Sequence, residues 1–225
     1  VKLVDLPSAA QEVKAVNPRL RTLVRHVGGG NTWSDDWAEN VAMAEAEYRA
    51  FVDVPSFAEY APFIDFVEEP RNEYINDDMT AAQLARRVLW ARACAYVWRE
   101  IFQPRWPHMR TLIGNVPVGN HAPLGLFKAA HDYGAGLAVH AYVPFSEPHV
   151  RDPLDFTYHS GRWVLDDALA RANGYLVDIA VTETGPYVDE WHGWRSALVL
   201  DGDEDGYVAV MEEVLRDWAT THAWR

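Results

Sequence analysis

The sequence has little cysteine, comparatively little positive charge and no long hydrophobic run. Its one cysteine, Cys94, cannot form an internal disulfide, and its place among Ala93, Ala95 and Val97 indicates a buried, inert thiol. Acidic residues outnumber basic residues by 33 to 20, which gives a formal net charge of −13. This balance argues against nucleic acid or an anionic membrane as a partner, because both require basic patches. No run of about 18 apolar residues is present, so no segment is expected to cross a membrane.

The sequence also lacks the usual signatures of metal and nucleotide sites. None of its nine histidines stands in a His-x-His or His-Glu-x-x-His pattern. The acidic run from Asp201 to Asp205 lacks the distal glutamate of an EF-hand, so a solvated turn is predicted there. Gly28, Gly29 and Gly30 have neither the Lys-Ser/Thr ending of a phosphate loop nor the spacing of a dinucleotide fingerprint, and they indicate a flexible loop. We therefore expect no metal and no other cofactor.

What the sequence does have is a regular alternation of apolar strands and amphipathic helices. Apolar residues make up 49% of the 225 positions, which is enough for a sizeable core in one domain spanning residues 1–225. Strands that are apolar throughout and alternate with helices indicate a parallel sheet covered on both faces. Strands are expected over residues 1–6, 20–27, 109–118, 137–143 and 175–183 and in the run that begins at residue 63, and helices over 8–16, 34–51, 80–98, 123–133, 163–173 and 207–218.

Several predicted helices carry recognisable ends. Ser8 to Gln11 and Thr80 to Gln83 each have the Ser/Thr-x-x-Gln form of a capping box, and Ser34-Asp35-Asp36 is a further N-terminal cap. Gly134 and Gly174 each follow a helix, where glycine often ends the last turn. The pattern predicts an α/β fold of the (β/α)8 TIM-barrel type that is incomplete, with about six β/α units.

Acidic residues stand at the ends of two of these strands. The strand that begins at Phe63 leads into Asn72 and Glu73, and the last predicted strand ends at Glu183. In a β/α barrel the carboxyl ends of all strands open on one face, where the active site lies. Two carboxyl groups on that face can serve glycoside hydrolysis, in which one donates a proton and the other attacks or stabilises the sugar cation. Glu68 and Glu69 compete with Glu73 for the acid role; Glu69 precedes Pro70 and is expected at the strand end, which favours Glu73.

These strand ends resemble a known family. Asn72-Glu73 after one strand, His140-x-Tyr142 on a later strand and Glu183 after another are similar to the retaining β/α-barrel glycoside hydrolases of clan A, especially the cellulase-like family 5. In that clan the corresponding motifs end the fourth, sixth and seventh strands. One predicted strand separates Asn72-Glu73 from His140 and none separates His140 from Glu183, so the intervals agree. The first and eighth strands of the barrel are then missing.

The resemblance implies a role for each matching residue. Glu73 would be the general acid/base and Glu183 the nucleophile, in a double-displacement mechanism that cleaves O-glycosidic bonds. Asn72 would hydrogen-bond the sugar, Tyr142 would donate its hydroxyl group to Glu183, and His140 would line the cleft. By position on the third strand of the barrel, further rim residues would be Arg25, which could pair with a carboxylate, and His26.

Tryptophan is abundant, with ten residues. Four of them are expected in loops, where an aromatic ring can stack on a sugar face: Trp33, Trp106, Trp191 and Trp194. Of these, Trp191 follows the strand of Glu183 and is the candidate for substrate binding. The expected partner is an oligo- or polysaccharide, with no nucleic acid and no membrane.

Two other functions stay open. A carbohydrate-binding or degenerate barrel without turnover would fit the two missing strands, and a metal-dependent hydrolase or aldolase barrel is disfavoured by the absence of metal-spaced histidines and of a strand-end lysine. The chain begins at Val1 rather than Met, so its true N-terminus is expected to be absent, and the sequence assigns neither a secreted nor a cytoplasmic location. Because two strands of the barrel are missing and the sheet would have open edges, we expect a fragment of a longer protein. A complete chain would be expected to pair with a second copy along the open edges of its sheet.

Overall fold

The computed structural model describes residues 1–26, 33–71, 79–117, 120–144, 162–187 and 216. Within these ranges six strands form one sheet in the order β1 to β6, and every neighbouring pair is parallel. The strands are β1 (Lys2–Val4), β2 (Leu23–Arg25), β3 (Phe66–Glu68), β4 (Arg110–Val116), β5 (Gly136–Pro144) and β6 (Ile179–Tyr187). Strand order that follows chain order is the winding of a β/α barrel.

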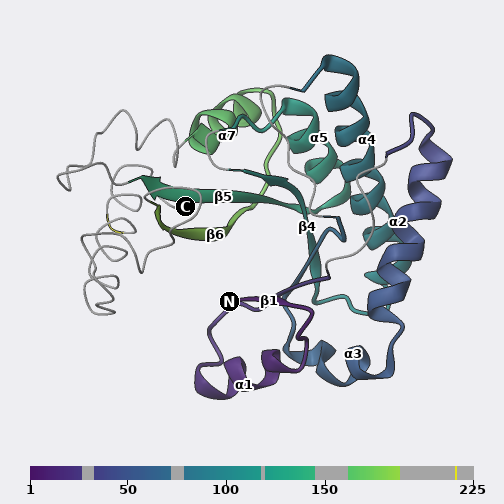
Figure 1. Cartoon of the computed structure of the whole chain (residues 1–225), viewed down its shortest axis with the longest axis vertical. Coiled ribbons are helices and arrows are strands. Elements are labelled where there is room, and N and C mark those ends of the chain that lie inside the picture. Colours follow the sequence, from purple (N-terminus) through teal and green to yellow (C-terminus); the bar gives the residue numbers. More distant parts are fainter. Residues whose placement is uncertain (27–32, 72–78, 118–119, 145–161, 188–215, 217–225) are drawn as a thin grey trace.

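The helices between the strands lie on one side of the curved sheet. Figure 1 shows them following its convex side from α1 past α2 and α4 to α7. They are α1 (Ala9–Val16), α2 (Trp37–Val52), α3 (Pro55–Tyr60), α4 (Ala81–Val97), α5 (Leu124–Tyr133) and α7 (Arg162–Ala172), with a 3-10 turn at Ala61–Phe63 and a π-helical turn at Trp98–Phe102. The described chain is therefore an incomplete β/α barrel, as the sequence predicts.

The larger core lies between the helices and the convex face of the sheet. Its largest buried side chains come from both layers and include Tyr48, Trp90 and Trp98 from the helical side and Ile113 from β4. A smaller cluster contains strand residues only, namely Leu23, Leu112 and Ala138 with Phe66 and Ala180 packed against it. Because side chains alternate along a strand, this second cluster marks the concave face, which is the interior of the barrel.

Most of the predicted helix ends are confirmed. Thr80 and Gln83 form both hydrogen bonds of a capping box, and Asp36 accepts a hydrogen bond from the backbone of Glu39. Gly134 and Gly174 have φ angles of 67° and 82°, the left-handed conformation that glycine adopts at no steric cost.

The capping box predicted at Ser8 is wrong. Ser8 itself has helical angles, φ −60° and ψ −34°, and its side chain makes no capping hydrogen bond. An N-cap residue needs an extended conformation to turn its hydroxyl group toward the first free N–H groups, so a helical Ser8 cannot serve.

The third strand also begins later than predicted. Ala61–Phe63 forms a 3-10 turn, and β3 starts only at Phe66. Asp65 lies just before β3. Its carboxylate accepts hydrogen bonds from Lys14, Arg21 and the backbone N–H of Thr22. The helix predicted over 207–218 lies outside the described residues except for Arg216, which is helical.

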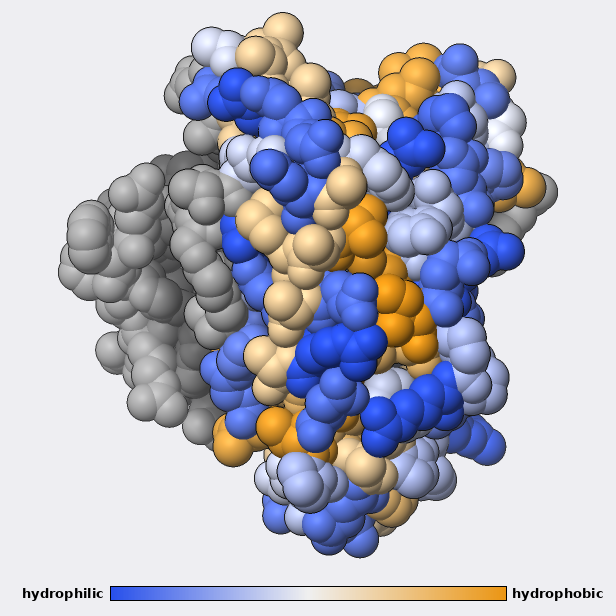
Figure 2. Space-filling view, turned by 90° about the vertical axis from the view of Figure 1, so that its right-hand side faces the viewer, coloured by the Kyte–Doolittle hydropathy of each residue, from blue (hydrophilic) through white to orange (hydrophobic). Residues whose placement is uncertain are grey.

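None of the helices in the described ranges has the length and apolar character needed to cross a bilayer. On the face viewed in Figure 2, hydrophilic residues predominate and apolar residues show between them. This is the outer surface of the helical layer, whose inner surface forms the core.

Candidate functional site

The carboxyl ends of β2 to β6 meet at one edge of the sheet, because all the strands are parallel. The order β3, β4, β5, β6 confirms the predicted intervals: one strand separates β3 from β5, and β5 and β6 are neighbours. Of the predicted site residues, Asn72, Glu73 and Trp191 lie outside the described residues, as do the side chains of Tyr142 and Glu183.

His140 of β5 and Glu183 of β6 occupy partner positions in the ladder. Val139 pairs with Val181, but the register then shifts, so that His140 pairs with Glu183 and Thr182 is passed over. Tyr142 pairs with Gly185. A one-residue irregularity of this kind changes which residue of a strand faces a given neighbour, and such bulges are frequent next to active sites.

His140 lines a small pocket at this edge. His140 is 5% exposed. Val116 and Pro117, at the end of β4, and Asn120, in the following loop, line the same pocket. Arg162 and Trp163, the first residues of α7, also line it. The lining therefore combines apolar residues of β4 and β5 with the ring of Trp163 and three polar side chains.

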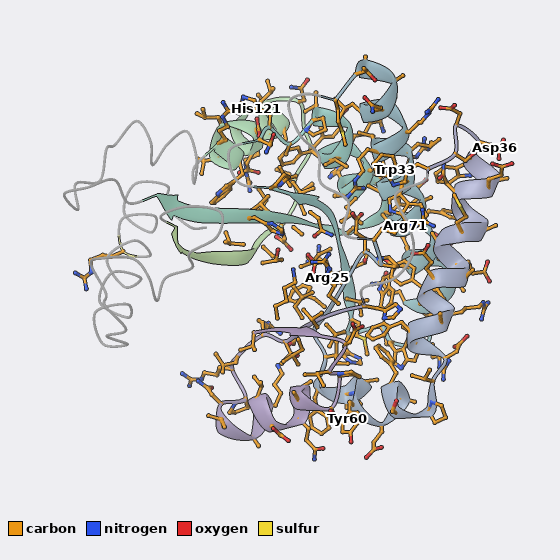
Figure 3. All side chains as sticks on the ribbon, in the orientation of Figure 1. Arg25, Trp33, Asp36, Tyr60, Arg71 and His121 are labelled. Carbon is orange, nitrogen blue, oxygen red and sulfur yellow. The ribbon has the colours of Figure 1, made fainter. Side chains whose placement is uncertain are left out.

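A histidine–aspartate pair lies on the same rim. His121 Nδ1 and Asp166 Oδ1 are 2.9 Å apart, and Asp166 Oδ2 accepts a hydrogen bond of 2.8 Å from the backbone N–H of Ala122. Figure 3 shows His121 beside α7. These contacts tie the loop after β4 to the first turns of α7, and so hold together two sides of the pocket.

The rim residues Asn120, His121, Arg162, Trp163 and Asp166 were not singled out from the sequence. They come from segments about 45 positions apart, and no local motif links them. The signal that was available is topological: Asn120 and His121 follow one strand, and the start of α7 follows the next, so all lie at the carboxyl edge.

Arg25 belongs to a charged cluster on the concave face. Lys2 Nζ lies 3.0 Å from Glu68 Oε2, and Arg25 Nε lies 3.9 Å from the same oxygen. Burial raises the pKa of the Glu68 carboxyl group, and the two cations oppose that rise. Glu68, one of the rivals for the acid role, is thus enclosed at 1% exposure and held by cations of β1 and β2.

His26, next to Arg25, is held at the end of β2. Its Nδ1 lies 2.8 Å from Asp5 Oδ1, and its ring stacks on Phe51 of α2 with 5.4 Å between the ring centroids. These contacts place His26 on the helical side of β2, whereas Arg25 lies on the concave side.

Glu69, the second rival acid, faces the helical layer. It is fully buried and forms an ion pair with Arg87 of α4, which also donates a 3.0 Å hydrogen bond to the carbonyl group of Gly114. Burial raises the pKa of Glu69, and Arg87 opposes that rise. A carboxyl group enclosed in this way links β3, β4 and α4 and has no access to a substrate.

Trp106 is not available to stack on a sugar face. It is 7% exposed, packs edge-on against Phe57 with 5.3 Å between ring centroids, and precedes β4, at the end of the sheet opposite the predicted site. Trp33 follows β2 on the expected side but is partly buried against the core, with the Arg87 guanidinium group 6.0 Å from its ring. Trp194 lies outside the described residues.

Across the described part of the chain, no group of three His, Cys, Asp or Glu residues is arranged to hold a metal ion. No protein-family model matches the sequence, and no curated protein matches it. Among solved structures, a glucosidase from Croceicoccus marinus matches with a TM-score of 0.44 and 15% sequence identity. The match covers 90% of this chain and 41% of that one, so the chain spans less than half of its length.

Proposed function

We propose that the protein is a retaining glycoside hydrolase that cleaves β-linked oligo- or polysaccharides at the carboxyl edge of its sheet. The proposal is supported chiefly by one observation: β5 and β6 are neighbours whose register pairs His140 with Glu183. The strand that leads to Asn72-Glu73 ends at the same edge, with a single strand between it and β5. This is the order in which the corresponding motifs occur in the family that the sequence resembles.

In the proposed mechanism Glu183 attacks the anomeric carbon while Glu73 protonates the departing oxygen. The resulting glycosyl-enzyme ester is hydrolysed by a water molecule that Glu73, now a base, deprotonates, and the configuration at the anomeric carbon is retained. Such a mechanism requires the two carboxyl groups to be about 5–5.5 Å apart, because the nucleophile must bond directly to the sugar. Tyr142 would keep Glu183 ionised by donating a hydrogen bond to it.

The other residues would bind the substrate. Asn72 would bind the sugar, with His140 beside it in the small pocket and Trp191 as a stacking ring. Trp163 and Asn120, which line the pocket with His140, join this group. Arg25, on the concave side and in contact with Glu68, would form a more distant part of the rim, whereas His26 is held on the helical side of β2 by Asp5 and Phe51.

The test is the hydrolysis of aryl β-glycosides by Glu73→Gln and Glu183→Gln variants. Each change keeps the shape of the side chain and removes its acid–base or nucleophilic capacity, so turnover should fall by at least about 1000-fold, within the range known for such groups. Glu100→Gln, a change at a half-exposed side chain of the π-helical turn, is the control and should leave turnover unchanged.

Azide separates the two roles. With Glu183→Gly, azide should restore turnover and give the glycosyl azide of inverted configuration, because the anion replaces the missing nucleophile. With Glu73→Gly, azide should give the product of retained configuration. Wild-type turnover in both glutamine variants would rule out the mechanism, and glycan binding by the wild-type chain without any product would instead select the non-catalytic carbohydrate-binding function.

A further inference from the structure

Arg71 is the last described residue before Asn72 and Glu73, and its side chain is held by two helices. It is 6% exposed. Its Nε donates a hydrogen bond of 2.6 Å to Glu47 Oε1 of α2, and its Nη2 forms an ion pair with the same carboxylate. The guanidinium carbon lies 4.6 Å from the centre of the Trp90 ring of α4. Figure 3 shows Arg71 on the side of the sheet that faces α2.

The main chain at Arg71 is held separately, from β4. The side-chain amide of Asn115 donates a hydrogen bond of 3.4 Å to the Arg71 carbonyl group. Asn115 is fully buried. Side chain and backbone of Arg71 are therefore attached to three different elements, α2, α4 and β4. A planar guanidinium group that both pairs and stacks has little rotational freedom left, and a lysine could not reproduce both contacts.

The position of Asn115 depends on an irregularity in β4. Gly114 and Asn115 have φ angles of 106° and 39°, and the register with β5 shifts between Ile113 and Val116. A side chain at Gly114 would also meet Leu137 Cδ1 at 2.9 Å. The carbonyl group of Gly114 is in turn held by Arg87. Left-handed angles at a non-glycine residue are costly and persist where surrounding contacts fix them, often near functional sites.

We propose that Arg71 is a positioning residue that fixes the carboxyl group of Glu73 relative to the departing oxygen of the substrate. The inference rests on the function proposed above. Arg71 is two residues before Glu73 in the sequence, and both its backbone and its side chain are attached, so the chain enters the segment of the acid from a fixed point. Displacement of a catalytic group by about 1 Å can lower a rate about 100-fold.

The test compares substrates that differ in their need for the acid. An aryl glycoside with a dinitrophenyl leaving group departs without protonation, whereas an unsubstituted phenyl leaving group requires it. In Arg71→Lys, kcat/KM for the phenyl glycoside should fall by about 100-fold and kcat/KM for the dinitrophenyl glycoside by less than about 3-fold. The basic limb of the pH profile of kcat/KM, which reports the acid, should also shift.

Tyr48→Phe is the matched control. It lies in the same layer between helices and sheet, is fully buried, and loses a hydroxyl contact of 2.9 Å with Thr111 Oγ1. It should lower thermal stability without discriminating between the two substrates. Asn115→Gly removes the amide that holds the Arg71 carbonyl group and relieves the left-handed strain, so it tests the same attachment through a second residue; a smaller loss confined to the phenyl glycoside is expected.

Equal losses on both substrates in Arg71→Lys and Asn115→Gly, or unchanged turnover of the phenyl glycoside, would overturn the inference and leave Arg71 a structural residue. The proposed function fails by a different result, namely wild-type turnover in Glu73→Gln. If Glu73 is required and Arg71 is not, only the positioning role is lost.

Discussion

At the scale of single residues, the ion pair between Glu69 and Arg87 is the most demanding feature of the described chain. Both side chains are fully buried, and Arg87 also satisfies the carbonyl group of Gly114. Two charges removed from water are tolerated only when each compensates the other and the remaining polar atoms are hydrogen-bonded. The pair thus joins the carboxyl ends of β3 and β4 to α4.

Glu69→Gln should lower the free energy of unfolding by about 3–5 kcal/mol, because it leaves the Arg87 charge buried without its counter-charge. Urea denaturation measures this loss. Asp35→Asn is the control: the Arg86–Asp35 pair is exposed to solvent, so its loss should have little effect on the free energy of unfolding. A double variant, Glu69→Leu with Arg87→Met, should recover much of the stability; a Glu69→Gln protein as stable as the wild type would contradict this account.

At the scale of elements, the two sequences that resemble capping boxes behave differently. Thr80 and Gln83 cap α4 by reciprocal hydrogen bonds, whereas Ser8 has helical angles and caps nothing. The same short motif therefore caps one helix and not the other. What differs is the backbone conformation of the first residue, which the preceding chain sets.

Thr80→Ala should lower the free energy of unfolding by about 1 kcal/mol, the usual value of an N-cap side chain. Ser8→Ala should change it by less than about 0.3 kcal/mol, since no capping bond is lost there. Thermal or urea unfolding of the two variants side by side gives the comparison. A larger effect at Ser8 than at Thr80 would show that the assigned caps are wrong.

At the scale of the whole molecule, Asp65 joins three segments that are distant in the sequence. Lys14 of α1, Arg21 before β2 and the backbone of Thr22 all donate hydrogen bonds to its carboxylate, just before β3. Partial burial acts to raise the pKa of Asp65, but the hydrogen bonds from Lys14, Thr22 and Arg21 outweigh it and lower the pKa from 3.8 to about 2. The first two β/α units are tied to the third through this one carboxylate.

A carboxyl group whose pKa is lower in the folded state than in the unfolded chain stabilises the fold above the unfolded pKa. Its contribution is fully present above about pH 4 and is lost as the pH falls toward 2. Asp65→Asn should therefore be less stable than the wild type near neutral pH, and the difference should shrink between about pH 4 and pH 2. Urea unfolding at a series of pH values measures it; a difference independent of pH would assign the effect to lost packing instead.

The sequence by itself determined the succession of strands and helices, most helix caps and the parallel, incomplete barrel that follows from them. These depend on local conformational preference and on hydrophobic periodicity, which are properties of short segments. The order in which Asn72-Glu73, His140 and Glu183 follow their strands could also be predicted, because parallel strands in sequential order bring their carboxyl ends to one edge.

Only the tertiary structure decided which polar residues meet. Several contacts join segments that no short pattern connects. They are the ion pairs Glu69–Arg87 and Lys2–Glu68, the contact between His121 and Asp166, and the burial of Trp106. The register of His140 with Glu183 likewise depends on a single irregularity in the ladder. Such contacts depend on how the helices pack and where a strand shifts by one residue, and these are set by the free energy of the whole core rather than by the residues on either side of each position.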